Sequence, residues 1–202
     1  MKMLLYCTKA KLFLRKSIKD KDYYLDNNSK FNIIPKEDYV LNGKIVAECD
    51  FEVDKLTNCG TSFMIMKYDD LKESYRYTNK IARDSCLNYT DLRRYLGTNN
   101  GYAIHIKNLH IFDKPKELNE VYKIEDIGGM LFTKPLTNAP QNMMMVSLNH
   151  WEYATYEPND INILISIRPE WLCKILNGEK TIEVRKKVLK EMLKWKNQAK
   201  LI

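Results

Sequence analysis

Apolar and polar side chains alternate along several segments of the chain, and this alternation predicts strands. Over residues 43–53 every second position from Ile45 to Val53 is apolar, and acidic residues fill most of the positions between them. A period of two is typical of a strand with one buried and one exposed face. The same pattern, or a short run rich in β-branched and aromatic residues, predicts further strands over 3–7, 101–112, 139–148, 161–167 and 180–186.

A period near 3.6 residues predicts helices in other segments. The best marked is 88–97, where Asn88 can cap the first turn and Gly97 can end the helix. The segment 169–178 begins with a proline and ends with a glycine, which is the usual asymmetry of helix ends. Weaker patterns predict helices over 68–83, 116–122 and 188–198.

The remaining segments are read from their polarity. Residues 11–41 are polar and charged, and we expect a long excursion that is partly helical. Residues 157–160 are the clearest linker, and there is no internal repeat. Many short strands with interspersed helices favour an α+β or small-barrel architecture over a doubly wound sheet.

The composition limits the class of protein. With 202 residues, of which 45% are hydrophobic, the chain can bury a sizeable core. The N-terminus has only six uncharged residues between Lys2 and Lys9, and no uncharged apolar run approaches 18 residues. We therefore expect a soluble, cytoplasmic protein that does not bind a membrane. The five cysteines form no C-x-x-C pair and predict reduced thiols instead of disulfides or a zinc site.

The net charge of +7 is unevenly distributed. Residues 186–202 hold six lysines and one glutamate, which leaves a net charge of only +2 for the other 185 residues. A nucleic-acid-binding tail and a merely solvated amphipathic tail are equally compatible with this pattern.

Several common catalytic motifs are absent from the chain. It contains no P-loop, no G-x-G-x-x-G after a strand, no H-E-x-x-H and no G-x-S-x-G. His105 lies inside an apolar strand, where a core histidine is more common than a metal ligand. We predict no cofactor and no metal.

One short motif does combine groups that can hold a ligand. The segment "NGEKTIEVRK" contains G-x-K-x-x-E-x-R, with Lys180, Glu183 and Arg185 after the glycine. Glu183 and Arg185 are two apart on a strand, so both project from one face, where they can pair and hold a phosphate or a base edge. Lys180 leaves the turn toward the other face and can reach around as a mobile cation. The alternative is an exposed strand with one surface ion pair.

The same segment, with "ISIRPEW" before it, resembles the ASCH domain family, whose members are small β-barrels related to the PUA RNA-binding fold. Five more blocks resemble the bacterial and phage version of the family in the same relative order: 4–11, 41–51, 85–97, 102–118 and 136–144. The resemblance therefore covers most of the chain. It implies an α+β fold, namely a PUA-like β-barrel over 1–185 with flanking helices, followed by a basic helix in the tail 186–202.

The order of the blocks differs from the usual one. In typical members the block found here at 161–185 comes first, next to the "YCTK" strand. The simplest hypothesis is a circular permutation, with the strand that ends at Arg185 beside or in line with Leu4–Cys7. A truncated tandem copy and a strand swap between protomers are the alternatives, and the oligomeric state stays open.

The resemblance also implies a function, which is binding of RNA or of a modified nucleoside. On the matching positions it implies Lys180 and Glu183 as catalytic candidates. The residues expected to contact the nucleic acid are Arg185, Arg168, Lys9, Tyr6 and Tyr102. Two alternatives remain: a non-catalytic phage or mobile-element accessory protein that binds a protein partner, and an amidohydrolase or ribonuclease.

Some positions depart from the family pattern. Glu183 stands where a hydrolytic branch has a threonine nucleophile, and Ile104 and Met143 replace frequent tryptophans. These changes weigh against covalent catalysis and against generic base stacking. Under this reading Glu183→Gln should alter ligand binding and leave the fold stable.

Overall fold

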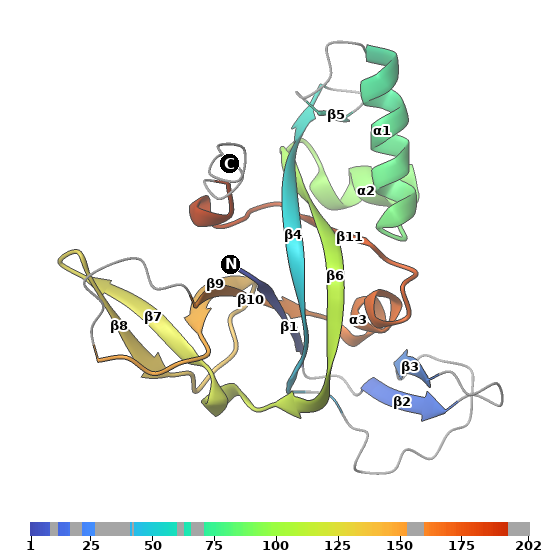
Figure 1. Ribbon diagram of the computed structural model, residues 1–202. Coiled ribbons are helices and arrows are strands. Elements are labelled where there is room, and N and C mark those ends of the chain that lie inside the picture. The colour runs from blue at the N-terminus through green and yellow to red at the C-terminus, as the bar shows by residue number, and fades with distance from the viewer. Residues whose placement is uncertain are drawn as a thin grey trace. The chain divides into compact units, whose positions relative to one another are not determined.

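The computed structural model describes residues 1–8, 12–16, 22–26, 41, 43–59, 63–65, 71–152 and 160–193 (Figure 1). The chain divides into two compact units, each composed of two segments. The first unit contains Met1–Asp50 and Asn108–Asn177, and the second contains Phe51–Lys107 and Gly178–Ile202. Strands and helices occur in both units, so the fold is of the α+β class.

The sheet of the first unit pairs the first strand of the chain with two strands that are distant from it in the sequence. Its order is β4-β1-β10-β9-β7-β8, and β1 and β10 are parallel whereas the other pairs are antiparallel. The strands are β1 (Met3–Cys7), the first half of β4 (Ile45–Asn58), β7 (Tyr122–Ile127), β8 (Met130–Pro135), β9 (Met143–Ser147) and β10 (Ile161–Ile167). A separate hairpin of β2 (Leu12–Lys16) and β3 (Asp22–Asp26) contacts helix α3 (Pro169–Leu176).

The central strands of this sheet are buried on both faces. All five residues of β1 are buried, and so are six of the seven residues of β10. Their near-continuous apolar sequences are typical of strands that are covered on both sides. The predictions of strands over 3–7 and 161–167 are confirmed, as is the proline at the first turn of α3.

The sequence reading missed the hairpin of β7 and β8. Gly128 and Gly129 join the two strands, both have positive φ angles (65° and 86°), and Ile127 pairs with Met130. A two-residue turn with two positive φ angles matches the right-handed twist of its strands, which is why Gly-Gly favours a hairpin. The signal was therefore present in the sequence.

The second unit places two helices against four strands. The strand order is β11-β6-β4, with β5 paired to the end of β4. The new elements are β5 (Phe63–Ile65), α1 (Leu71–Asp84), α2 (Tyr89–Leu96), β6 (Gly101–Lys116) and β11 (Ile182–Arg185). Because β11 is antiparallel to β6, Glu183 lies opposite Ile104 and Arg185 lies opposite Tyr102.

Helix α2 begins and ends where its sequence predicts. The side chain of Asn88 accepts a hydrogen bond from the backbone N–H of Asp91 at 2.8 Å. At the other end Gly97, with a φ of 64°, donates its N–H to the carbonyl of Arg93 at 2.7 Å. Both ends therefore satisfy backbone groups that a helix leaves unpaired.

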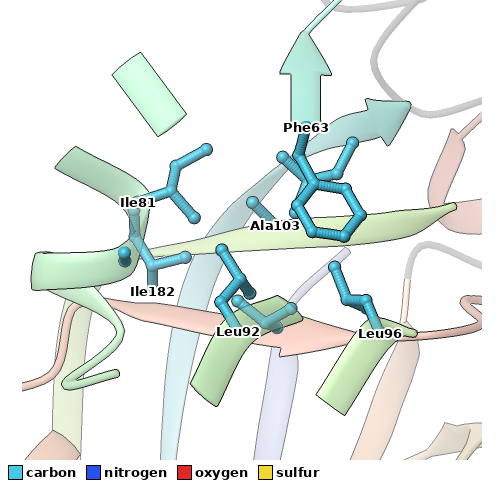
Figure 2. Close-up of a cluster of buried hydrophobic side chains, with 9 residues drawn as sticks. Phe63, Ile81, Leu92, Leu96, Ala103 and Ile182 are labelled. Carbon is cyan, nitrogen blue, oxygen red and sulfur yellow. The ribbon is translucent and has the colours of Figure 1, made fainter. Parts of the chain in front are cut away.

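A single apolar cluster joins the helices of the second unit to its strands. Figure 2 shows Ile81 and Leu92 from the helices facing Ile182 of β11. The other members are Leu56, Phe63, Ala82, Leu96, Ala103 and Val184. Leu92 is fully buried, so the amphipathic face of α2 is what attaches this helix to the sheet.

The expectation of a closed β-barrel is wrong. In each unit the described strands form an open order, from β4 to β8 in the first unit and from β11 to β5 in the second. Of the two positions expected for the last strand, the one beside Leu4–Cys7 is wrong, because β1 already has β4 and β10 as neighbours and β11 pairs with β6.

Other predicted elements differ in detail. The excursion over 11–41 contains the strands β2 and β3, and β6 continues to Lys116 instead of stopping at 112. The short helix expected over 116–122 is one 3-10 turn, η2 (Leu118–Glu120). Of the tail helix expected over 188–198, residues 190–193 are helical, residues 188 and 189 are not, and the rest lies outside the described residues, as does most of the linker. No helix in the described part of the chain is long and apolar enough to cross a membrane.

The packing of α2 leads to a prediction about stability. Leu92→Ala should lower the free energy of unfolding by about 2–5 kcal/mol, because it leaves a cavity in the cluster of the second unit. Urea denaturation followed by circular dichroism measures this change. Arg93→Ala on the exposed side of the same helix is the matched control, with an expected change within about 0.5 kcal/mol. Equal effects of the two substitutions would contradict the assigned packing.

Candidate functional site

The site is built at the C-terminal end of α1. Leu87 donates its N–H to the carbonyl of Ala82, and Cys86 donates its N–H to the carbonyl of Arg83, both at 2.9 Å. Cys86 has a φ of 56°. These two bonds around a residue in the left-handed region form a Schellman motif, with cysteine at the position where glycine is usual. The motif leaves the carbonyls of the last helical residues without partners inside the helix.

The segment before β11 supplies those partners. The backbone N–H of Thr181 donates to the carbonyl of Asp84 at 2.9 Å. The ammonium group of Lys180 donates to the carbonyl of Ser85 at 2.8 Å. A cation at this position also meets the partial negative charge of the helix end. Lys180 therefore caps α1 from a distant part of the sequence.

Glu183 links this lysine to the arginine of the motif. The Nζ of Lys180 lies 3.3 Å from Oε2 of Glu183, and the Nε of Arg185 lies 2.7 Å from Oε1 of the same carboxylate. Lys180 is 3% exposed and Glu183 is 7% exposed, whereas the side chain of Arg185 is 16% exposed. The three side chains form a chain of ion pairs whose outer end is Arg185.

Burial changes the protonation chemistry of the lysine. Removal of the ammonium group from water lowers the pKa of Lys180 below its ordinary value of 10.5, and the nearby carboxylate of Glu183 opposes this shift. A buried lysine with a lowered pKa is a candidate base. At 3% exposure, however, the structure gives a substrate no access to it.

The structure brings together only part of the predicted residue set. Glu183 and Arg185 lie on one face of β11 and pair, as the spacing predicts. Lys180 is not the mobile surface cation that we expected, because it is buried and held by Ser85. Tyr102 lies on β6 opposite Arg185.

The other predicted contacts belong to the first unit or lie outside the described residues. Tyr6 is a core residue of β1, where burial raises the pKa of its hydroxyl. Arg168 is exposed next to α3, and its guanidinium lies 3.8 Å from the carboxylate of Glu170. Lys9 lies outside the described residues.

The sequence reading did not anticipate a second polar cluster in the same unit. The Nε2 of His105 and Oδ2 of Asp54 are 3.0 Å apart, and the hydroxyl of Tyr77 donates to the same oxygen at 3.2 Å. Asp54 is buried and His105 is mostly buried, and the two side chains are partners of each other. His105 is therefore a core histidine, as its position in an apolar strand predicts. Its partners come from β4 and α1, which no local pattern could identify. Within the described residues no group of histidine, cysteine, aspartate and glutamate side chains is arranged to hold a metal ion.

Comparison with known proteins adds no relative to this picture. No protein-family model matches the chain, and neither a curated protein nor a solved structure matches it significantly.

The position of Glu183 between two cations predicts a large effect of its neutralisation. Glu183→Gln should lower the free energy of unfolding by about 3–5 kcal/mol, because Lys180 and Arg185 would remain buried or half-buried without a carboxylate between them. This expectation reverses the one drawn from the sequence. Urea denaturation at neutral pH measures it, with Glu179→Gln as an exposed control on the same segment. Unchanged stability of Glu183→Gln would show that the ion pairs contribute little to the fold.

The lowered pKa of Lys180 predicts a pH dependence of stability. Since the unfolded chain holds this proton more tightly than the folded one, the contribution of Lys180 becomes more favourable as the pH rises toward 10.5. The difference in unfolding free energy, wild type minus Lys180→Met, should therefore increase between about pH 7 and pH 10. Lys55→Met, at an exposed position of the same unit, controls for the loss of one lysine. A constant or falling difference for Lys180→Met would contradict the assigned burial.

Proposed function

We propose that the chain is a nucleic-acid-binding protein related to the ASCH family, and that it holds RNA, or a modified nucleoside within it, at the second unit near Arg185. The observation that carries this proposal is the distribution of charge between the units. The second unit contains 17 lysines and arginines against 10 acidic residues, a net charge of +7. The first unit contains the other 16 basic residues and 16 acidic residues, so its net charge is zero.

This partition supports a polyanionic partner for one half of the molecule. A surface that concentrates positive charge raises the rate and strength of its association with phosphate groups. The tail 186–202 contributes +5 of this net charge, and the rest of the unit, which includes exposed arginines on α1 and α2 and the motif strand β11, contributes +2. An uncharged partner would gain nothing from the difference in net charge between the two units.

Within the ion-pair chain the three residues have different roles. Arg185 is the member nearest to solvent, and its guanidinium can donate in parallel to two phosphate oxygens. Glu183 fixes the orientation of Arg185, and Lys180 fixes Glu183 to the end of α1. Lys180 and Glu183 are therefore positioning residues, and the burial of Lys180 makes hydrolysis the weaker alternative.

The position of the block over 161–185 in the fold also supports the proposed relation to the ASCH family. β10 lies between β1 and β9, and β11 completes the second unit next to β6. A block that is an integral part of both units favours a permuted single copy over the remnant of a second domain.

The test of the proposal is an affinity measurement with defined variants. Fluorescence anisotropy with a labelled single-stranded RNA of about 12 nucleotides should show salt-sensitive binding by the wild type. Arg185→Gln should weaken it about tenfold, which corresponds to about 1.4 kcal/mol. Truncation after Leu193, which removes three lysines and keeps the buried Met192, should have a smaller effect.

The alternatives make different predictions in the same assay. Full binding by Arg185→Gln with loss of binding on truncation would indicate a non-specific, tail-driven mode. An absence of RNA binding by the wild type would favour the accessory protein with a protein partner. Circular dichroism of each variant at the assay temperature separates a loss of contact from a loss of fold.

A further inference from the structure

A hollow of about 630 Å³ lies beside α2 in the second unit and is open to solvent. It is a separate feature from the ion-pair chain, since none of Lys180, Glu183 and Arg185 lines it. Its size is within the range of pockets that hold small ligands or parts of larger ones.

One face of α2 forms a wall of this hollow. Thr90, Arg93 and Arg94 line it together with Gly97, a spacing of three and four residues that places all of them on one side of the helix. The buried residues Leu92 and Leu96 lie on the side that packs against the sheet. The hollow is therefore fixed by the same packing that attaches α2 to the unit.

Other lining residues come from the ends of two strands. Asn58 ends β4, and Asn100 immediately precedes β6. The backbone N–H of Asn58 donates to Oδ1 of Asn100 at 2.9 Å, and the side-chain amide of Asn58 donates to the carbonyl of Gly97 at 3.3 Å. These bonds hold the two strand ends to α2 and occupy the amide oxygen of Asn100. The NH₂ group of Asn100 is the part of that side chain left to donate.

The lining is rich in donors and contains no carboxylate. The lining residues carry two guanidinium groups, two asparagine amides and the hydroxyls of Thr90 and Thr98. The carboxylate of Asp91 lies 3.4 Å from Arg94, and both side chains are exposed. Because an exposed ion pair contributes little free energy, a phosphate can take the place of Asp91 at Arg94 at little cost. Among the described residues Arg93 makes no ion pair, although an exposed guanidinium readily binds phosphate.

We infer that this hollow is a second binding site, which takes backbone phosphates of the nucleic acid. Two guanidiniums with amide and hydroxyl donors suit a phosphodiester, because each of its two non-bridging oxygens accepts more than one hydrogen bond. Contacts to phosphates position a strand and carry no sequence information. The hollow thus anchors the strand while residues near Arg185 contact another part of it. This inference rests on the proposed function.

The experiment uses the full chain and the same labelled RNA of about 12 nucleotides. The double variant Arg93→Gln/Arg94→Gln should weaken binding at least about tenfold at physiological salt. It should also lower the slope of log affinity against log salt by about 1.4, since each phosphate contact to a single strand contributes about 0.7. Lys80→Gln/Arg83→Gln removes the same charge from exposed positions of α1 in the same unit. This matched control should change affinity less than about threefold, because neither residue lines the hollow.

A second variant tests the site with little risk to the fold. Asn100→Asp keeps the acceptor for the N–H of Asn58 and replaces the NH₂ donor with a carboxylate oxygen. It should weaken RNA binding severalfold, whereas an unchanged melting temperature would confirm that the fold is intact.

The outcomes separate this inference from the proposed function. If the wild type binds RNA and the double variant loses no more affinity than the control, the hollow is not a phosphate site and the proposed function stands. If the wild type binds RNA and Arg185→Gln has no effect while the double variant loses binding, the hollow is confirmed and the role of Arg185 is wrong. If the wild type binds no RNA, both proposals are overturned.

Discussion

The second unit depends on one buried cation. The ammonium group of Lys180 contacts the partially negative C-terminal end of α1 on one side and the carboxylate of Glu183 on the other. Its burial would be costly without both partners, because an ammonium group in an apolar environment loses its hydration. With them it joins the end of a helix to a strand almost a hundred residues later in the sequence. The left-handed conformation of Cys86 turns the chain at this point and leaves the Ser85 carbonyl for the lysine.

This arrangement changes what the G-x-K-x-x-E-x-R motif means physically. Two of its three charged residues, Lys180 and Glu183, are buried and held by ion pairs, and only Arg185 approaches the surface. A motif that looks like a set of ligand-binding side chains can thus act mainly as a clamp that orients one of them. The same unit holds the whole net charge of the chain and a donor-lined hollow on α2, so the proposed binding of an anion does not rest on the motif alone.

Local sequence rules predicted the elements whose ends are chemically marked. Asn88 and Gly97 delimit α2, and Pro169 begins α3, because each satisfies or removes backbone groups within a few residues. The alternation over 43–53 identified β4, although not its full length. The hairpin at Gly128 and Gly129 was predictable by the same rules and was missed, and half of the residues in each of its strands are exposed.

The sequence by itself determined the types of the elements that caps, turns and alternation mark, the common face of Glu183 and Arg185, and the absence of common catalytic motifs. Only the tertiary structure decided that the strand order stays open, that β11 pairs with β6, and that Lys180 is buried against α1. The reason is physical: caps, turns and alternation act over a few residues, whereas strand neighbours and the burial of a charge depend on segments distant in the sequence. The hollow belongs to the second group as well, since its walls come from α2 and from the ends of two strands.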